Sequence, residues 1–395
     1  SDSLKDLEDF YREAKQRFDS DPEFQTRSRK VVVELQSGDA ATLAQWQTFI
    51  DISMSHCQSI YQQLGVGLQR EHMHGESAYN DDLAPIVAHL DAHNLLQESA
   101  GAQCVFLEEF KNRDGEPLPI IVKKSDGGFL YATSDLAAVR YRVQQLKADR
   151  VLYFVDARQA LHFKQIFAVA KAAGLVEEQV ELNHMPFGTM LGKNNKPFKT
   201  REGALVKLSD LLDEAVLRAK QMLLDRKVQE KNPQIDAAEL DHIAKVIGIG
   251  AIKYADLSKN RTSDYVFDWD QMLSFEGNTS PYLQYAYTRI QSIFSRADID
   301  PAELPERVIC EDEWERRLAV SIAGFNDLLD QVAEEGYPHQ LCAYLYDLAG
   351  RFAQFYEQCP ILSSEHEVKV RRLKLAAQAA DVLATGLELL GIGVV

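Results

Sequence analysis

The strongest constraint on the fold is a change of pattern along the chain, from alternating strands and helices to helices alone. Apolar periodicity predicts a strand at 129–132, a helix at 134–146, a strand at 151–155, a helix at 159–173 and a strand at 180–184. Strands and helices in this order form a parallel sheet with right-handed crossovers. We therefore expect an α/β plus all-α chain, with half of a doubly wound, Rossmann-type sheet followed by a helical bundle.

The other segments divide around this half-sheet. Helical periodicity without strands covers the N-terminal region, and short strands at 105–107 and 120–123 flank a turn at 112–115. Further helices are expected at 208–227, 240–257, 281–295, 314–333, 339–358 and 367–390. We place domain boundaries to give a helical insertion at 1–48, a segment of the sheet domain at 49–75, a strand-bearing insertion at 76–128, the half-sheet at 129–205, a connecting helix and linker at 206–236, and the bundle at 237–395.

Composition limits the class of protein. The longest apolar runs are far shorter than the ~20 residues of a membrane span. Residues 1–8 contain neither the basic region nor the apolar region of a secretion signal. We therefore expect a cytoplasmic protein without a membrane partner. Five cysteines without a Cys-x-x-Cys pair argue against a disulfide framework or a zinc site. The net charge of −17 opposes general nucleic-acid binding, so a nucleic acid would have to contact local basic patches.

Polar residues follow the first expected strand, where ligands of open parallel sheets bind. Ser134 could cap the next helix and Asp135 could interact with its dipole, which would explain both residues structurally. The functional alternative is that the hydroxyl of Tyr131 and the carboxylate of Asp135 bind a cationic group. A guanidinium suits a fixed carboxylate well because it offers forked donors and keeps its charge.

Polar residues at a spacing of three follow the second expected strand. Gln159, His162 and Gln165 would line one face of a helix, and this face could simply be solvated. The functional alternative has Gln159 contacting an amino-acid substrate and His162 contacting ATP.

A basic loop follows the third expected strand. It contains Lys193, Lys196, Lys199 and Arg201 among glycine and asparagine residues. Loops of this composition are often solvated turns. At the mouth of a nucleotide-binding sheet, however, their cations could neutralise a triphosphate and its transition state.

Several motifs together resemble one family. The segment 196–200 stands where class I aminoacyl-tRNA synthetases carry their KMSKS-type loop. Read with the segments 75–77, 131–135, 159–162 and 187–193, it is similar to the arginyl-tRNA synthetase family. The segments 250–261, 267–270 and 276–289 extend the resemblance, and 342–350 resembles the DALR-type anticodon-binding bundle.

The resemblance implies ATP-dependent activation of L-arginine to arginyl-adenylate and its transfer to tRNA(Arg). Mg²⁺ would accompany ATP, with no protein-bound metal or organic cofactor, and the protein would be a monomer. By position, arginine would be bound by Glu76, Tyr131, Asp135 and Gln159. ATP would be bound by His162, the backbone of Met190 and Leu191, and the catalytic lysines Lys196 and Lys199.

For the tRNA partner, the resemblance and the chemistry of base stacking point to Tyr282, Tyr285 and Arg289, with Tyr287 nearby. Tyrosines at this spacing could equally pack a helix. Both interpretations stay open at this point.

The chain departs from the family pattern in one respect. No His-Ile-Gly-His signature occurs, and the similar string at 72–75 has its residues in the wrong order. We therefore expect the N-terminal domain and the first part of the catalytic sheet to be missing, and the activity of this chain to be impaired. The alternatives are a noncatalytic tRNA-binding fragment or homologue, and another nucleotidyltransferase with a similar half-sheet.

Overall fold

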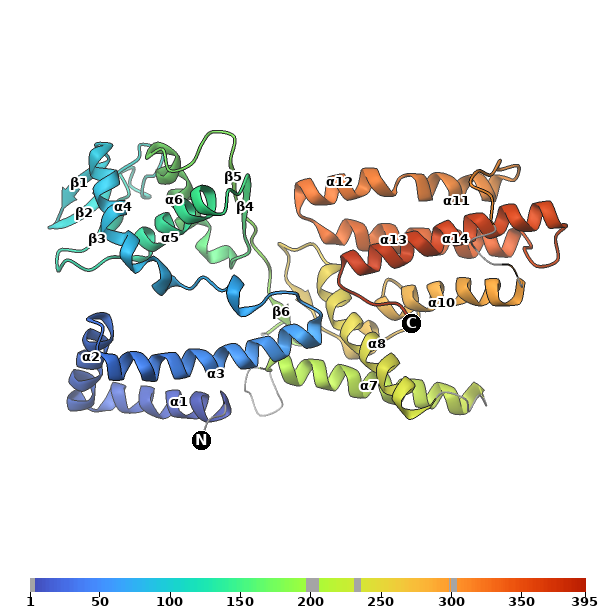
Figure 1. Cartoon of the computed structure of the whole chain (residues 1–395), viewed down its shortest axis with the longest axis horizontal. Helices are drawn as coiled ribbons and strands as arrows, with labels where there is room; N and C mark the ends of the chain where they lie inside the picture. The colour runs from blue at the N-terminus through green and yellow to red at the C-terminus, as the bar shows by residue number, and fades with distance from the viewer. Residues whose placement is uncertain (1–3, 197–205, 231–235, 298, 300–303) are drawn as a thin grey trace. The chain divides into compact units, whose positions relative to one another are not determined.

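The computed structural model describes residues 4–196, 206–230, 236–297, 299 and 304–395 (Figure 1). These residues form two compact units. One comprises Ser1–Met73 with Lys207–Glu214, and the other comprises His74–Val206 with Ala215–Val395. Within the described ranges, we find no helix with both the length and the apolar character needed to cross a bilayer.

The first unit is built from three helices that pack on one another. They are α1 (Leu4–Ser20), α2 (Pro22–Gln36) and α3 (Ala40–Leu64). The Asp21 carboxylate accepts hydrogen bonds from two N–H groups at the start of α2, and Asp39 does the same for one N–H of α3. Gly65 ends α3 with a φ of 65°, a left-handed conformation that glycine adopts without strain. The helices expected from the periodicity of residues 1 to about 70 are therefore present as far as residue 64.

The first half of the second unit combines two small sheets with three helices. Its elements are α4 (Asn80–Ala92), β1 (Leu96–Ser99), β2 (Ala102–Val105), β3 (Ile120–Lys123), α5 (Tyr131–Arg140), β4 (Arg150–Tyr153), α6 (Ala160–Ala172) and β5 (Glu181–His184). Strands β1, β2 and β3 form an antiparallel sheet, whereas β4 and β5 pair in parallel with Val151 opposite Leu182. Buried side chains from both sheets and all three helices, including Val105, Leu136 and Ile166, form one core. The strand-bearing segment therefore shares the core of the parallel sheet.

Several sequence predictions in this half differ from the structure. Residues 129–132 do not form a parallel strand: Phe129 makes only an isolated antiparallel bridge to Lys123, and α5 begins at Tyr131. The reason is that Gly127 turns the chain with a φ of 87°, and the alanine-rich residues that follow favour a helix. The α-helical part of α5 ends at Arg140, whereas an α-helix was expected to run to 146. A π-helical turn (Tyr141–Gln145) follows it directly. In the antiparallel sheet, β1 was not expected and β2 lies earlier than 105–107.

A second parallel pair joins segments far apart in the sequence. Strand β6 (Met190–Leu191) pairs with β7 (Tyr265–Val266), so that Met190 lies opposite Tyr265. The pairing is extended by hydrogen bonds from Gly188 N–H to the Arg261 carbonyl, 2.8 Å, and from Phe267 N–H to the Leu191 carbonyl, 2.8 Å. Strand β7 was not expected, because residues beyond 237 were predicted to be wholly helical.

Helices form the rest of the second unit. They are α7 (Leu208–Glu230), whose first residues belong to the other unit, α8 (Ala237–Leu257), α9 (Trp269–Met272), α10 (Ser280–Ala297), α11 (Glu313–Ala323), α12 (Phe325–Glu335), α13 (Pro338–Gln358) and α14 (His366–Leu389). In Figure 1, α13 and α14 run beside α11 and α10, and these helices share a core with α8. The helix expected at 314–333 is two helices that meet at Gly324, the residue type that stabilises a helix interior least apart from proline.

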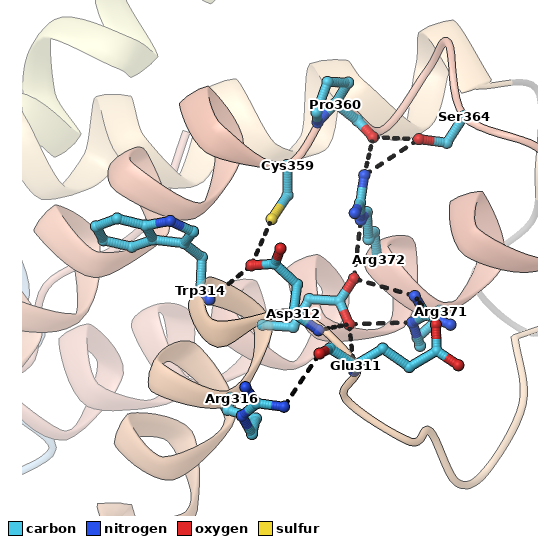
Figure 2. A network of polar contacts seen from close by, with 10 residues as sticks. Glu311, Asp312, Trp314, Arg316, Cys359, Pro360, Ser364, Arg371 and Arg372 are labelled. Carbon is cyan, nitrogen blue, oxygen red and sulfur yellow. Dashed lines mark hydrogen bonds and ion pairs between the residues drawn. The ribbon is translucent and has the colours of Figure 1, made fainter.

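A buried ion-pair network joins two helices of this bundle (Figure 2). The side chain of Glu315 on α11 is fully buried and accepts hydrogen bonds from Arg371 Nε, 3.1 Å, and Arg372 Nε, 2.9 Å, both on α14. Burial favours the neutral acid and acts to raise the pKa of Glu315. The hydrogen bonds from Arg372, from the Glu311 N–H and from Arg371 outweigh this effect, so the pKa of Glu315 lies below its usual value.

Candidate active site

A polar cleft of about 540 Å³ lies in the second unit, where the starts of α5 and α6 approach the 3-10 turn Glu76–Tyr79. It is lined by His74, Glu76, Tyr79, Tyr131, Ser134, Asp135, Ala138, Arg142, Val155, Arg158, Gln159, His162 and Phe163. Five of the residues singled out in the sequence therefore meet in one place: Glu76, Tyr131, Asp135, Gln159 and His162.

The first turn of α5 carries a hydroxyl group, that of Ser134, which hydrogen-bonds to one of the two cleft carboxylates, Glu76. Ser134 is buried, and its Oγ donates to Glu76 Oε1, 3.3 Å, and contacts the Tyr131 carbonyl, 3.1 Å. Ser134 does not cap α5, because the helix already begins at Tyr131 and the cap position is Leu130, which makes no side-chain hydrogen bond. Its role is to connect Glu76 to α5.

The second carboxylate is held by a histidine. Asp135 Oδ2 lies 2.5 Å from His162 Nε2, and the two side chains are 31% and 32% exposed. Gln159 occupies the cap position of α6 and lines the same cleft. Gln165, which shares the spacing of three, does not line the cleft, and no partner among the described residues accepts from its buried amide nitrogen.

The cations of the cleft have partners of their own. Arg142 donates to the Tyr153 hydroxyl, 2.9 Å, and Arg158 makes two bonds of 2.9 Å to Asp156. The hydrogen bond from Arg158 lowers the pKa of Asp156 to about 2, while burial raises the pKa of Tyr153. Neither arginine makes an ion pair with Glu76 or Asp135 among the contacts of the described residues, so both carboxylates keep acceptor positions for a ligand.

Apart from His162, the described residues assigned to ATP lie outside the cleft. Met190 and Leu191 form β6, and neither they nor Lys196 line the cleft. Lys196 is exposed, while Lys199 and Arg201 lie outside the described residues. Lys193, at the start of the same loop, pairs with Asp268 at 2.9 Å. Hydrogen bonding to Asp268 raises the pKa of Lys193.

The tyrosines considered for tRNA binding differ in their surroundings. Tyr282 and Tyr287 pack against the bundle core, in accordance with the packing alternative. Tyr285 is 41% exposed. The guanidinium of Arg289 lies over the ring of Tyr356, 5.4 Å from its centroid.

Sequence patterns did not point to several residues of the cleft. His74 stacks on Tyr141 with ring centroids 4.0 Å apart and meets Tyr79 edge to face. Burial raises the pKa of Tyr79, whose hydroxyl has no hydrogen-bond partner among the described residues. Two sequence signals could have linked His74 to the cleft: it lies two residues before Glu76, and it belongs to the string at 72–75 that was set aside for its residue order.

Comparison with known families agrees with the two halves of this architecture. Residues 1–269 match the model of the catalytic domain of class I (R) tRNA synthetases. Residues 283–395 match the DALR anticodon binding domain. A parallel half-sheet with a polar cleft and a following helical bundle thus define a class I aminoacyl-tRNA synthetase.

Individual relatives narrow the class. The chain is 59% identical over 393 residues to an arginine–tRNA ligase of Alcanivorax borkumensis, covering 99% of the chain and 66% of the relative. It is 58% identical to one of Marinomonas sp., covering 99% and 67%. Among solved structures, the arginyl-tRNA synthetase of Plasmodium falciparum superposes with a TM-score of 0.82 at 30% identity, covering 94% of this chain and 62% of that one. The Thermus thermophilus enzyme shares the fold, with a TM-score of 0.76 at 22% identity, covering 96% and 68%.

The chain belongs to the arginyl-tRNA synthetase family. It spans about two thirds of the length of the curated relatives that it matches.

Proposed function

We propose that this protein is an arginine–tRNA ligase whose arginine site is the polar cleft of the second unit. The observation that carries the proposal is the convergence of Asp135, Glu76, Tyr131 and Gln159, which come from three elements of the chain, on one cleft. Two fixed carboxylates beside a hydroxyl and an amide suit a ligand with a planar cation and several N–H donors.

The proposed reaction has two steps. A carboxylate oxygen of arginine attacks the α-phosphorus of ATP, which enters with Mg²⁺, and pyrophosphate leaves with the electron pair of the broken P–O bond. A ribose hydroxyl of the terminal adenosine of tRNA(Arg) then attacks the activated carbonyl carbon, and AMP leaves. In this scheme Lys196 and Lys199 of the basic loop neutralise the phosphates, and Met190 and Leu191 bind ATP through their backbone.

The cleft would also provide selectivity. A site that aims buried or half-buried carboxylates at a guanidinium leaves them unpaired when a substrate lacks that group, and polar sites of this kind discriminate by ~10⁴ or more. The bundle would bind tRNA, with Tyr285 and Arg289 as candidate contacts. We propose a monomer that works in the cytoplasm, where tRNA and ATP are available.

The proposal is tested by exchange of pyrophosphate into ATP in the presence of arginine, measured with and without tRNA(Arg). We expect Asp135→Asn to raise the KM for arginine about a hundredfold, in the range found when one partner of a desolvated charge pair is removed, and to change the KM for ATP by less than about threefold. Equal losses for both substrates would contradict the assignment of Asp135 to arginine. Exchange that does not depend on arginine would contradict the proposed activity.

A further inference from the structure

The two cleft carboxylates are held by side chains of different chemistry. Glu76 accepts from the hydroxyl of Ser134, 3.3 Å, and Asp135 contacts the imidazole of His162, 2.5 Å. A serine hydroxyl stays neutral over the working range of proteins. An imidazole is the side chain that ordinarily changes its charge between about pH 5 and 8. The anchor of Asp135 can therefore change charge, whereas the anchor of Glu76 cannot.

We propose that His162 is a positioning residue for the Asp135 carboxylate and thereby sets how strongly the cleft binds arginine. This inference rests on the proposed function. It gives His162 a role on the arginine side of the reaction, where the resemblance to the family had suggested contact with ATP.

The two protonation states of the imidazole would act in opposite directions. The neutral ring donates through Nε2 to Asp135 Oδ2, which fixes the carboxylate and leaves its negative charge and Oδ1 available. A guanidinium needs both, because it binds carboxylates through parallel N–H···O bonds. The protonated ring forms an ion pair that cancels the charge of Asp135. Arginine must then compete with a cation already in place.

The other titratable and charged groups around Asp135 and His162 do not hold the Asp135 carboxylate. Those that face the cleft or pack beside it are Glu76 and His74 before α4, Tyr79 in the 3-10 turn, Tyr131 on α5, Arg142 in the π-helical turn, Arg158 before α6, and His184 on β5. Arg142 and Arg158 are bonded to Tyr153 and Asp156. His184 bonds to the Val155 carbonyl, 3.0 Å, and lies outside the cleft lining. His74 is the one other imidazole among the described lining residues, and it serves as the matched control.

The experiment is calorimetric titration of the full chain with L-arginine between pH 8 and pH 5.5, in two buffers of different ionisation enthalpy. If one proton must leave His162 for arginine to bind, affinity falls toward the limit of about tenfold per pH unit, and binding releases up to about one proton. His162→Gln keeps a neutral donor near the position of Nε2. It should bind arginine within a few-fold of the wild type at pH 8, with a flat pH profile and no proton release.

Two further variants complete the design. His162→Ala removes the anchor without a substitute and should weaken arginine binding already at pH 8, while ATP binding is unchanged. His74→Gln should keep the pH profile of the wild type. Circular dichroism of each variant shows that it is folded. Because arginine titrates identically in every sample, ionisation of the ligand cannot explain a difference between variants.

The outcomes separate the two proposals. A pH profile and proton release that persist in His162→Gln, or that disappear in His74→Gln, would overturn the role of His162 and leave the proposed function intact. No binding of arginine at any pH would overturn the proposed function, and this inference with it.

Discussion

At the residue scale, the cleft depends on contacts that connect side chains distant in the sequence. Asp135 lies on α5, which begins at Tyr131 and not at residue 134 as the sequence indicated. Its character as a ligand for a cation was predictable from residue type. Its contact with His162, 27 positions later, was not, because spacing along one helix cannot reveal what lies opposite. The same holds for Ser134, which looked like a helix cap and in fact bonds to Glu76.

Gly188 is a second residue whose role follows from a contact far along the chain. A Cβ added there would lie 2.2 Å from the Ser263 carbonyl oxygen, so the close approach of the two backbones leaves no room for a side chain. We expect Gly188→Ala to lower the free energy of unfolding by about 1–3 kcal/mol, the usual cost of overpacking. Urea unfolding of the chain measures the change.

The control for this prediction is Gly350→Ala on α13, where an added Cβ meets no atom within 4 Å. That variant should be more stable by about 0.5–1 kcal/mol because alanine favours a helix interior. Equal effects of the two substitutions would show that the contact with Ser263 is unimportant for stability.

At the element scale, α11 and α14 are joined by the network around Glu315 (Figure 2). Glu315→Gln removes the charge that compensates the burial of Arg372 and one of the two charges that pair with Arg371, which keeps its ion pair with Glu311, 3.0 Å. We expect a loss of about 3–5 kcal/mol in the free energy of unfolding, as for other broken buried ion pairs. The matched control is Glu313→Gln on the same helix. Its pair with Arg317 is exposed, so a loss below about 1 kcal/mol is expected.

The stability difference between the wild type and Glu315→Gln should depend on pH with a definite sign. The pKa of Glu315 is lowered in the folded state, so the unfolded chain binds a proton more readily at this residue. The stability difference between wild type and Glu315→Gln should be constant above about pH 5 and shrink as the pH falls below about 4.3, the ordinary value for glutamate. A difference that grew on acidification would show that the ion pair does not stabilise the bundle.

Elements with a strong periodic signal were predicted well. Strand β3 and helices α8, α10, α13 and α14 lie within a few residues of their expected bounds. The two residues of β7 carry no periodicity, and their pairing with β6 is set by tertiary contacts. The segment 129–132 was misjudged because four apolar and small residues fit a strand and a helix start equally well.

At the scale of the whole molecule, the order of the two patterns along the chain was the most informative feature. The change from a sheet to helices alone indicated the fold class, whereas the class of protein was indicated by several motifs read together, and the family matches agree with both. The net charge of −17 is compatible with a tRNA partner only if binding surfaces are local. Domain boundaries within this order stay predictions.

The central claim is that the cleft recognises a guanidinium cation. It is tested most directly by comparing the binding of L-arginine and L-citrulline to the chain at pH 8, since citrulline has nearly the same shape with a neutral urea in place of the guanidinium. We predict that citrulline binds at least about a hundredfold more weakly, and that Asp135→Asn reduces this preference because the removed carboxylate is the partner of the charge. Equal affinities for arginine and citrulline in the wild-type chain would contradict the claim.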